Sequence, residues 1–245
     1  MLQADRIALI TGASSGIGLA LARMLVERGL KVICAARRPE RLEPVVAELG
    51  ARAHALPLDV TDAQATAGLI ERLPRELREI DILINNAGHD LGGRRRFDEG
   101  DVDDWAAIID ANVTGVIRVT HAVIPGMLAR GRGHIVNLGS IAGQRVMRHG
   151  NIYNASKFAV RALTEGLRMD YADTDLRITE ILPGITRTGF AAARHRDDEA
   201  RASAFYEGFP STMTPDDVAR TVLFALDQPP HVTIAQLVVV PTREA

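Results

Sequence analysis

Short apolar runs recur along the chain, separated by longer stretches in which apolar positions follow helical spacing. The runs are near-continuously apolar, so each predicts a strand that is buried on both faces. They cover residues 6–11, 31–36, 53–58, 81–85, 134–138, 177–182 and 236–240.

The stretches between these runs carry helix signals. Apolar residues at helical spacing follow the first run and stop at Gly29, a residue type common just after a helix. Pro39 suits the first turn of a second helix, which Gly50 ends. A long helical pattern covers about residues 102–130, and the stretch 214–217 combines a capping threonine, a first-turn proline and an acidic third residue.

Strands that alternate with helices favour parallel pairing through right-handed crossovers, with helices on both faces of the sheet. We therefore predict an α/β fold with a doubly wound, seven-stranded parallel sheet. We expect one domain over residues 1–245, since no linker or repeat divides the chain. Residues 185–213, rich in charged and small residues, interrupt the alternation after a strand's carboxyl end, where such sheets bind ligands. This segment is a candidate substrate lid, although its composition fits a solvated surface excursion equally well.

Composition narrows the function classes. Apolar residues make up 47% and charged residues 24% of the chain, as in ordinary globular proteins. A formal net charge of −2 gives no support to a general nucleic-acid binder, which carries a basic excess. Cys34 is the single cysteine, so no intrachain disulfide can form and a reducing compartment is expected.

No targeting segment is evident. The stretch 1–12 has too short an apolar run for a signal peptide and continues directly into the first predicted strand. Apolar runs also fall short of the ~18 residues that a membrane span requires. We therefore expect a cytoplasmic protein that does not act at a membrane.

A glycine-rich turn, TGASSGIG at residues 11–18, links the first predicted strand to the first predicted helix. Glycines permit a tight turn and a close approach of the backbone to phosphate, and a helix amino terminus attracts a pyrophosphate. The spacing differs from the general G-x-G-x-x-G pattern, and packing alone could require these glycines. The candidate cofactor-binding residues of this turn are Gly12, Ser14, Ser15, Gly16, Ile17 and Gly18.

The end of the second predicted strand distinguishes between nicotinamide cofactors. An acidic residue there binds the ribose hydroxyl of NAD, whereas arginine accommodates the 2′-phosphate of NADP. Ala36 stands at the acidic position and is followed by Arg37 and Arg38. A guanidinium matches phosphate geometry, so the sequence favours NADP(H), with two plain surface arginines as the alternative.

Tyr153 and Lys157 are four positions apart and would share one face of a helix. A pair of this kind on its own is usually surface decoration. Free tyrosine has a pKa near 10 and is a poor base at neutral pH, but a nearby ammonium group lowers that pKa. The two residues are therefore a candidate proton-transfer pair.

Several such signals occur in one order along the chain, and together they resemble the short-chain dehydrogenase/reductase family, in its single-domain subgroup of about this length. The resemblance covers residues 6–240 and implies a Rossmann-type fold and NADP(H)-dependent interconversion of alcohols and carbonyl compounds, without a metal. The motifs that carry it are the glycine turn, Asp59-Val60, NNAG at 85–88, Asn112, Ser140, Tyr153 with Lys157, and Pro183-Gly184.

The resemblance assigns roles to four catalytic residues. Tyr153 exchanges a proton with the substrate oxygen, and Ser140 hydrogen-bonds the same oxygen. Lys157 also holds the nicotinamide ribose. Asn112 shapes its helix and anchors a water that connects the lysine to solvent. Taken singly, Ser140 could be a turn residue at a strand end and Asn112 an ordinary polar residue within a helix.

Further cofactor positions follow from the same resemblance. Asp59 and Val60 match an adenine-contacting pair, although Asp59 could simply start a turn. Asn85, Asn86, Ala87 and Gly88 match the segment that lines the cofactor and braces the sheet. The late segment matches the region that meets the carboxamide and phosphates, and its candidates are Pro183, Gly184, Thr186 and Thr188, with the two threonines competing for the carboxamide side.

The local sequence of the chain is similar to the sequences of bacterial NADP-dependent 3-hydroxy acid (serine and allo-threonine) dehydrogenases and of sulfoacetaldehyde reductases. The loops 89–97 and 143–150 lie where the family builds its substrate pocket, and both are rich in arginine. We expect a small carbonyl or alcohol substrate, with an anionic one as a hypothesis. The candidates for its acid group are Arg148 and the loop arginines Arg94, Arg95, Arg96 and Arg145, with His89 at the border. Solvated loop arginines are the alternative.

Two rival functions use the same fold. An epimerase or dehydratase would usually add a larger carboxyl-terminal substrate domain, and a non-catalytic NADP-binding regulator would usually lack the tyrosine or the lysine. The resemblance also implies a homotetramer or homodimer, paired through the long helix before the fifth strand and the Tyr153 helix. The small and apolar residues compatible with this pairing are Ala155, Ala159, Ala162, Leu163 and Leu167.

Overall fold

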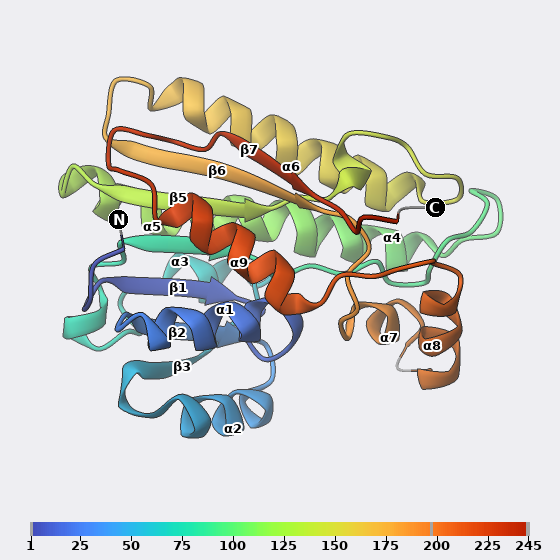
Figure 1. The fold of residues 1–245 in the computed structure, drawn as a ribbon, viewed down its shortest axis with the longest axis horizontal. Coiled ribbons are helices and arrows are strands. Elements are labelled where there is room, and N and C mark those ends of the chain that lie inside the picture. The colour runs from blue at the N-terminus through green and yellow to red at the C-terminus, as the bar shows by residue number, and fades with distance from the viewer. Residues whose placement is uncertain (1, 197, 244–245) are drawn as a thin grey trace.

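The computed structural model describes residues 2–196 and 198–243. Within them, a sheet of seven parallel strands has the order β3-β2-β1-β4-β5-β6-β7 (Figure 1). The predicted doubly wound α/β fold is confirmed. The ends of each predicted run agree with the ends of a strand to within two residues. The strands are β1 (Ile7–Thr11), β2 (Lys31–Ala36), β3 (Ala53–Pro57), β4 (Ile82–Asn85), β5 (Gly133–Leu138), β6 (Leu176–Pro183) and β7 (Gln236–Val239).

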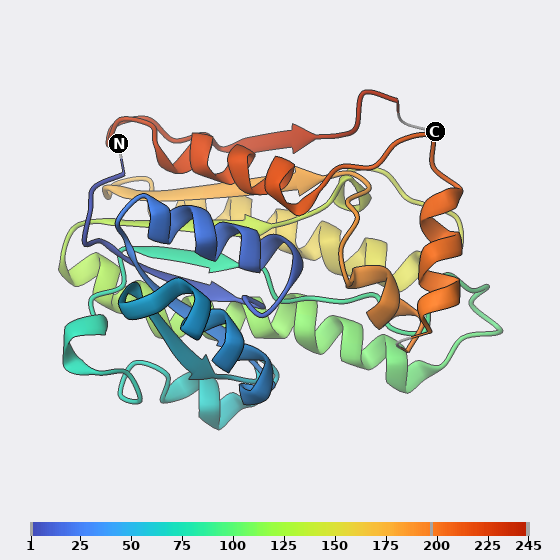
Figure 2. The same ribbon diagram turned by 60° about the horizontal axis from the view of Figure 1, so that its bottom comes forward.

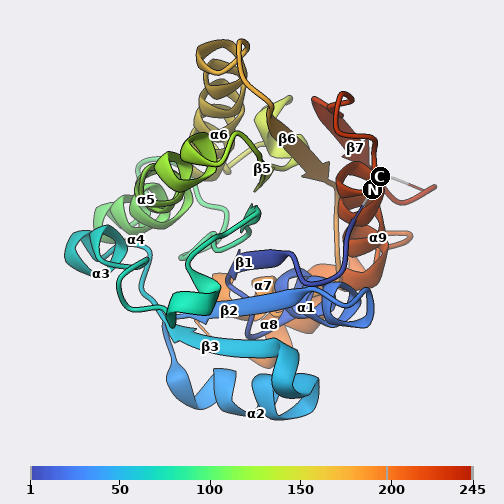
Figure 3. The same ribbon diagram turned by 90° about the vertical axis from the view of Figure 1, so that its left-hand side faces the viewer.

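Helices cover both faces of the sheet, as Figure 3 shows when the strands are viewed nearly end-on. One face carries α1, α2 and α9, and the other carries α3, α4, α5 and α6. The helices are α1 (Gly16–Glu27), α2 (Pro39–Leu49), α3 (Ala63–Ala67), α4 (Val102–Ile109), α5 (Gly115–Ala129), α6 (Asn151–Asp170), α7 (Phe190–Arg194), α8 (Glu199–Glu207) and α9 (Pro215–Leu226).

Local signals explain where several helices begin and end. Thr214 and Asp217 form a reciprocal capping box at the start of α9. Gly29, just beyond α1, has φ +83°, and Gly50, at the end of α2, has φ +70°. Both values lie in the left-handed region that favours glycine.

The strand order reverses direction between β1 and β4, because the chain first builds outward to β3 and then returns. In open parallel sheets a crevice forms at such a switch point, outside the carboxyl ends of the strands. Buried polar side chains brace the sheet there. Asn85 on β4 donates to Asn137 on β5 and to Thr120 on α5, and Asn137 donates to Thr164 on α6.

The long helical pattern predicted for 102–130 forms α4 and α5, joined by a wide π-helical turn at residues 110–114. Contrary to the sequence-based expectation, residues 102–129 are long and apolar enough to cross a membrane by length and composition. Half of that apolar window is buried within the fold. The helix therefore fits a place in the core of a globular domain.

Residues 185–213 form a unit at the carboxyl ends of the strands, where α7 and α8 stand beside the sheet (Figure 2). Ala191, Ala202 and Tyr206 form a small apolar cluster inside it. In the described part of this segment, ion pairs of Arg194 with Asp90 and of Arg196 with Asp104 join it to the rest of the fold. The segment is thus packed over the crevice.

Candidate active site

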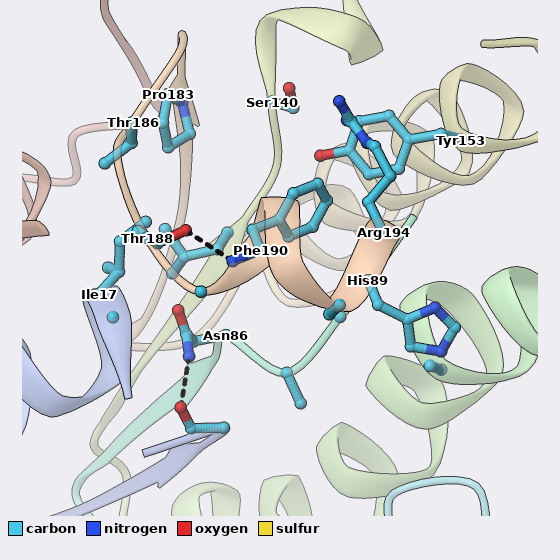
Figure 4. Close-up of a pocket in the computed structure, with 18 of the residues that line it drawn as sticks. Ile17, Asn86, His89, Ser140, Tyr153, Pro183, Thr186, Thr188, Phe190 and Arg194 are labelled. Carbon is cyan, nitrogen blue, oxygen red and sulfur yellow. Dashed lines mark hydrogen bonds between the residues drawn. The ribbon is translucent and has the colours of Figure 1, made fainter. Parts of the chain in front are cut away.

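A cavity of about 960 Å³ lies at the carboxyl ends of the strands and is lined in part by residues of α7 and α8. Figure 4 shows some of its lining residues. Its volume lies at the upper end of the range for small-molecule and cofactor sites. Most of the sequence-predicted cofactor positions line it. These are Gly12, Ser14, Ser15, Gly16, Ile17, Arg37, Arg38, Asp59, Val60, Asn86, Ala87, Gly88, Tyr153, Lys157, Pro183, Gly184, Thr186 and Thr188.

The glycine turn is built for close backbone approach. Gly12 has φ +68° and Gly16 has φ +56°, conformations that residues with a side chain rarely adopt. A Cβ on Gly18 would lie 2.4 Å from the Gly12 carbonyl oxygen, so Gly18 supports the turn from behind instead of lining the cavity. Ser15 precedes α1 without a side-chain cap. The first N–H groups of α1 therefore remain available to an anion.

Asn86 and Thr11 hold this turn against β4. The Asn86 side chain donates to the Thr11 and Gly12 carbonyl oxygens, and the Thr11 hydroxyl accepts from the backbone N–H groups of Asn86 and Ala87. The cofactor-lining segment after β4 is thereby fixed relative to the helix amino terminus.

Asn112 lies behind the cavity, in the wide turn between α4 and α5. Its amide donates to the His89 carbonyl oxygen and to the Ser156 hydroxyl, and its side-chain oxygen accepts from the His89 N–H. Turns of this π-helical kind occur frequently at functional sites. Asn112 therefore ties three segments together around Gly88, where a Cβ would lie only 2.8 Å from its side-chain oxygen.

Ser140, Tyr153 and Lys157 gather at the centre of the cavity, from the end of β5 and from α6. Tyr153 hydrogen-bonds Ser140. The Lys157 Nζ donates to the Leu138 carbonyl oxygen at 2.8 Å and lies 5.8 Å from the centroid of the Tyr153 ring. The helical spacing thus places the ammonium group beneath the phenol.

The electrostatics of the pair differ from the sequence-based expectation. Burial raises the pKa of Tyr153 to about 12, and the influences that oppose this rise are the Ser140 hydrogen bond and the charges of Arg194 and Arg94. Burial lowers the pKa of Lys157 to about 8, partly offset by Glu180. Lys157 donates its hydrogen bond to the Leu138 backbone carbonyl. The cations that lower the pKa of Tyr153 here are Arg194 and Arg94.

Thr186 and Thr188, the two candidates for the carboxamide side of the cofactor, lie in different parts of the segment after β6. Thr188 lies 3.3 Å from where a Cβ of Gly16 would be, close to the α1 amino terminus. The Thr186 hydroxyl turns back to donate to the Gly184 carbonyl oxygen. Tyr206 of α8 donates to the carbonyl oxygens of both residues, at 3.2 and 2.9 Å. The segment after β6 is thus held by α8.

The arginine-rich loops separate into two groups. Arg94, Arg145 and Arg148 line the cavity, as does His89. Arg95 donates to the Gly92 carbonyl oxygen and Arg96 pairs with Asp98, so neither of these two borders the cavity. Burial lowers the pKa of His89, which keeps that ring neutral near neutral pH.

Sequence reasoning missed the residues that α7 and α8 bring to the cavity. Phe190 and Arg194 of α7 and Phe205 of α8 line it, and Figure 4 shows Phe190 and Arg194 beside Tyr153. The Tyr153 and Phe190 rings meet edge to face with centroids 5.6 Å apart. The local sequence carried no signal for these contacts, because they depend on how residues 185–213 fold back.

Comparison with known proteins places this geometry in a family. Residues 6–199 match the sequence profile of the short chain dehydrogenase family. An NADP-dependent 3-hydroxy acid dehydrogenase of Salmonella typhi is 40% identical over 98% of this chain and 96% of its own. Sulfoacetaldehyde reductase 2 of Chromohalobacter salexigens is also 40% identical, over 98% of this chain and 95% of its own.

A solved structure agrees with both comparisons. The closed form of a serine dehydrogenase complexed with NADP+ superposes with a TM-score of 0.92 and 39% identity, covering 95% of this chain and 94% of that one. The chain therefore belongs to the short-chain dehydrogenase family.

Proposed function

We propose that the protein is an NADP(H)-dependent oxidoreductase that interconverts a small carbonyl compound and its alcohol. The observation that carries this proposal is the cluster of Ser140 with the buried Tyr153 and Lys157, which lines the same cavity as the glycine turn. Relatives with NADP in their names or bound in their structures support the choice of cofactor. They also favour catalysis over a non-catalytic regulator.

The residues present fit a dinucleotide. Gly12 and Gly16 line the cavity at the α1 amino terminus, where a pyrophosphate would bind, and Arg37 and Arg38 line it at the end of β2, where a 2′-phosphate would bind. Asp59 and Val60 border the adenine region, and Lys157 is the candidate for the nicotinamide ribose. When bound, NADPH supplies the hydride for reduction.

Tyr153 carries the proton in this scheme. With a pKa raised to about 12, its phenol is protonated at neutral pH and is suited to give a proton to the carbonyl oxygen during reduction. The Ser140 oxygen accepts from the Ala142 N–H at 3.1 Å, and its hydroxyl hydrogen, which meets Tyr153 here, is the donor that we assign to the same carbonyl oxygen when substrate is bound. Asn112 keeps the surrounding backbone in place.

The substrate class follows from the relatives, whose names include 3-hydroxy acid dehydrogenase, serine 3-dehydrogenase and sulfoacetaldehyde reductase. We infer a small 3-hydroxy acid, or a sulfonate analogue of one. The cationic side chains around the cavity support an anionic substrate.

We further propose a single domain over 1–245, with 185–213 as substrate lid, acting in the cytoplasm as a homotetramer or homodimer. Exposed apolar side chains on α5 and α6, among them Ile117 and Phe158, support pairing through these helices.

The test is NADPH consumption with a panel of small oxo acids, followed by absorbance. We expect Tyr153→Phe to lose at least about a thousandfold in kcat, since it removes the proton donor, while NADPH binding measured by fluorescence persists. NADH should perform clearly worse than NADPH. Turnover that survives in a folded Tyr153→Phe variant would refute the proposed mechanism.

A further inference from the structure

Arg194, the last residue of α7, is a feature of the cavity that proton and hydride transfer leave unexplained. The residue is 4% exposed, and its Nη2 lies 2.7 Å from Oδ2 of the equally buried Asp90. Its Nε and Nη1 atoms are buried and have no hydrogen-bond partner among the described residues. These two nitrogens carry three of the five guanidinium N–H bonds, and buried donors without acceptors are costly.

Aromatic rings surround this guanidinium. Its Cζ lies 4.4 Å from the centroid of the Phe205 ring and 5.4 Å from that of Phe190. Ring faces attract a cation, but they are weak acceptors for N–H donors. The ring contacts and Asp90 thus hold Arg194 in one orientation while leaving its donors unused.

Among the residues that the structure describes, the charges at this end of the cavity are unbalanced. Arg94 also lies against Phe205, with its Cζ 6.0 Å from the ring centroid. Burial, and next the charge of Arg194, lowers the pKa of Arg94, so the two cations interact. Asp90 is the carboxylate that offsets them, and the adjacent His89 is kept neutral by burial. Two cations facing one anion favour the entry of another anion.

The Arg194 guanidinium lies near the candidate catalytic group, since its charge lowers the pKa of Tyr153. Phe190 contacts both side chains, at 5.4 Å from the Arg194 Cζ and with its ring centroid 5.6 Å from that of Tyr153. Figure 4 shows Arg194 and Tyr153 reaching toward the same part of the cavity as Ser140. The arginines placed for a cofactor phosphate, Arg37 and Arg38, belong instead to the end of β2.

We propose that Arg194, oriented by Asp90 and assisted by Arg94, binds the carboxylate or sulfonate of the substrate and so selects an acid over its neutral analogue. This inference rests on the proposed function and names the residue that sets its substrate class. Arg148, one of the arginines suggested by the sequence, is exposed at the rim of the cavity. The lid therefore supplies the recognition group, so that anion binding and lid closure occur together.

The test compares acetoacetate with its neutral methyl ester as substrates for NADPH-dependent reduction. Wild type should have the higher kcat/KM for the acid. In Arg194→Met the ratio of acid to ester kcat/KM should fall by about 30-fold or more, as expected for the loss of a charge-assisted hydrogen bond. Arg194→Gln should act in the same direction and serves where the methionine variant does not fold.

Arg196→Met is the matched control. Arg196 lies two residues further along the lid and pairs with Asp104, but it does not line the cavity. Its loss should change the acid-to-ester ratio less than about threefold, even if lid closure weakens and both activities decline. An equal loss of selectivity in both variants would mean that Arg194 acts only through lid closure, which would overturn the proposal.

The remaining outcomes separate this inference from the proposed function. Wild-type turnover of the ester without preference for the acid, or an unchanged ratio in the folded Arg194 variants, overturns the inference and leaves the oxidoreductase intact. Absence of NADPH consumption with any carbonyl compound refutes the proposed function. In that case calorimetry with acetoacetate and the NADP+-loaded protein decides the inference, since wild type should bind the acid and Arg194→Met should not.

Discussion

Lys157 carries an amino group at a buried position, and this gives the site a pH limit. The pKa is lowered by burial from 10.5 to about 8, so the group is charged below about pH 8 and loses its charge as the pH rises further. The Tyr153 pKa of about 12 keeps the phenol protonated across the same range. The lysine should therefore titrate first.

We predict that kcat/KM for reduction is constant from about pH 6 to about pH 8 and then declines by up to tenfold per pH unit, because the charged ammonium is the candidate group that holds the nicotinamide ribose. Lys157→Arg keeps a charge that arginine does not lose, so its decline should move to higher pH even if its activity is lower. The check is a pair of pH–rate profiles at saturating NADPH. A wild-type profile that stays level beyond about pH 9.5 would contradict this role.

At the scale of elements, the turn between β1 and α1 depends on the absence of side chains. A Cβ on Gly18 would lie 2.4 Å from the Gly12 carbonyl oxygen and 2.6 Å from the Asn86 side-chain nitrogen. Because both contacts belong to the hydrogen-bonded turn, alanine there must displace Asn86 or the backbone. By contrast, a Cβ added to Gly166, inside α6, would meet no described atom of a neighbouring residue within 4 Å.

We predict opposite effects for alanine at these two positions. Gly18→Ala should destabilise the fold by about 1–3 kcal/mol through overpacking and weaken NADPH binding by about tenfold or more. Gly166→Ala should stabilise it by about 0.5–1 kcal/mol through helix propensity and leave NADPH binding unaltered. Urea unfolding and NADPH titration measure both effects. Equal effects of the two substitutions would mean that the turn tolerates a side chain.

At the scale of the whole molecule, Cys34 reports on global unfolding. It lies in β2 with no exposed surface, paired with Ile10 of β1 and Ala55 of β3. Burial raises the pKa of its thiol to about 12, so the reactive thiolate is suppressed and the side chain is enclosed. A reagent reaches it only when the sheet opens.

We predict that the native protein does not react with a disulfide reagent such as dithionitrobenzoate, and that one thiol per chain reacts after denaturation. Under mildly denaturing conditions, saturating NADP+ should slow labelling, because its binding to the folded protein lowers the unfolded population. The labelling rate should fall by the factor by which NADP+ raises the folding equilibrium constant. Labelling rates followed against urea concentration provide the measurement. Rapid native labelling would show local opening of β2, which the packing of both sheet faces opposes.

Most of the fold follows from local sequence features. The near-continuous apolar strands, the glycines at 29 and 50 and the capping residues at 214–217 specify elements whose bounds the structure reproduces closely. Strand and helix preference depends on neighbours a few residues apart, and alternation of the two restricts the topology to parallel crossovers. The motifs likewise indicated Tyr153, Lys157, Ser140 and the glycine turn, because each needs a certain residue type at a certain spacing.

The tertiary structure decided what depends on distant segments meeting. It directed Lys157 to the Leu138 carbonyl and brought arginine charges to Tyr153, where the spacing alone had suggested a direct lysine effect. It placed Arg194 in the cavity through a contact with Asp90, more than a hundred positions away, and set Arg95 and Arg96 outside it. Spacing along a helix determines which residues share a face, but burial and charge at a site arise from all the chain that packs around it.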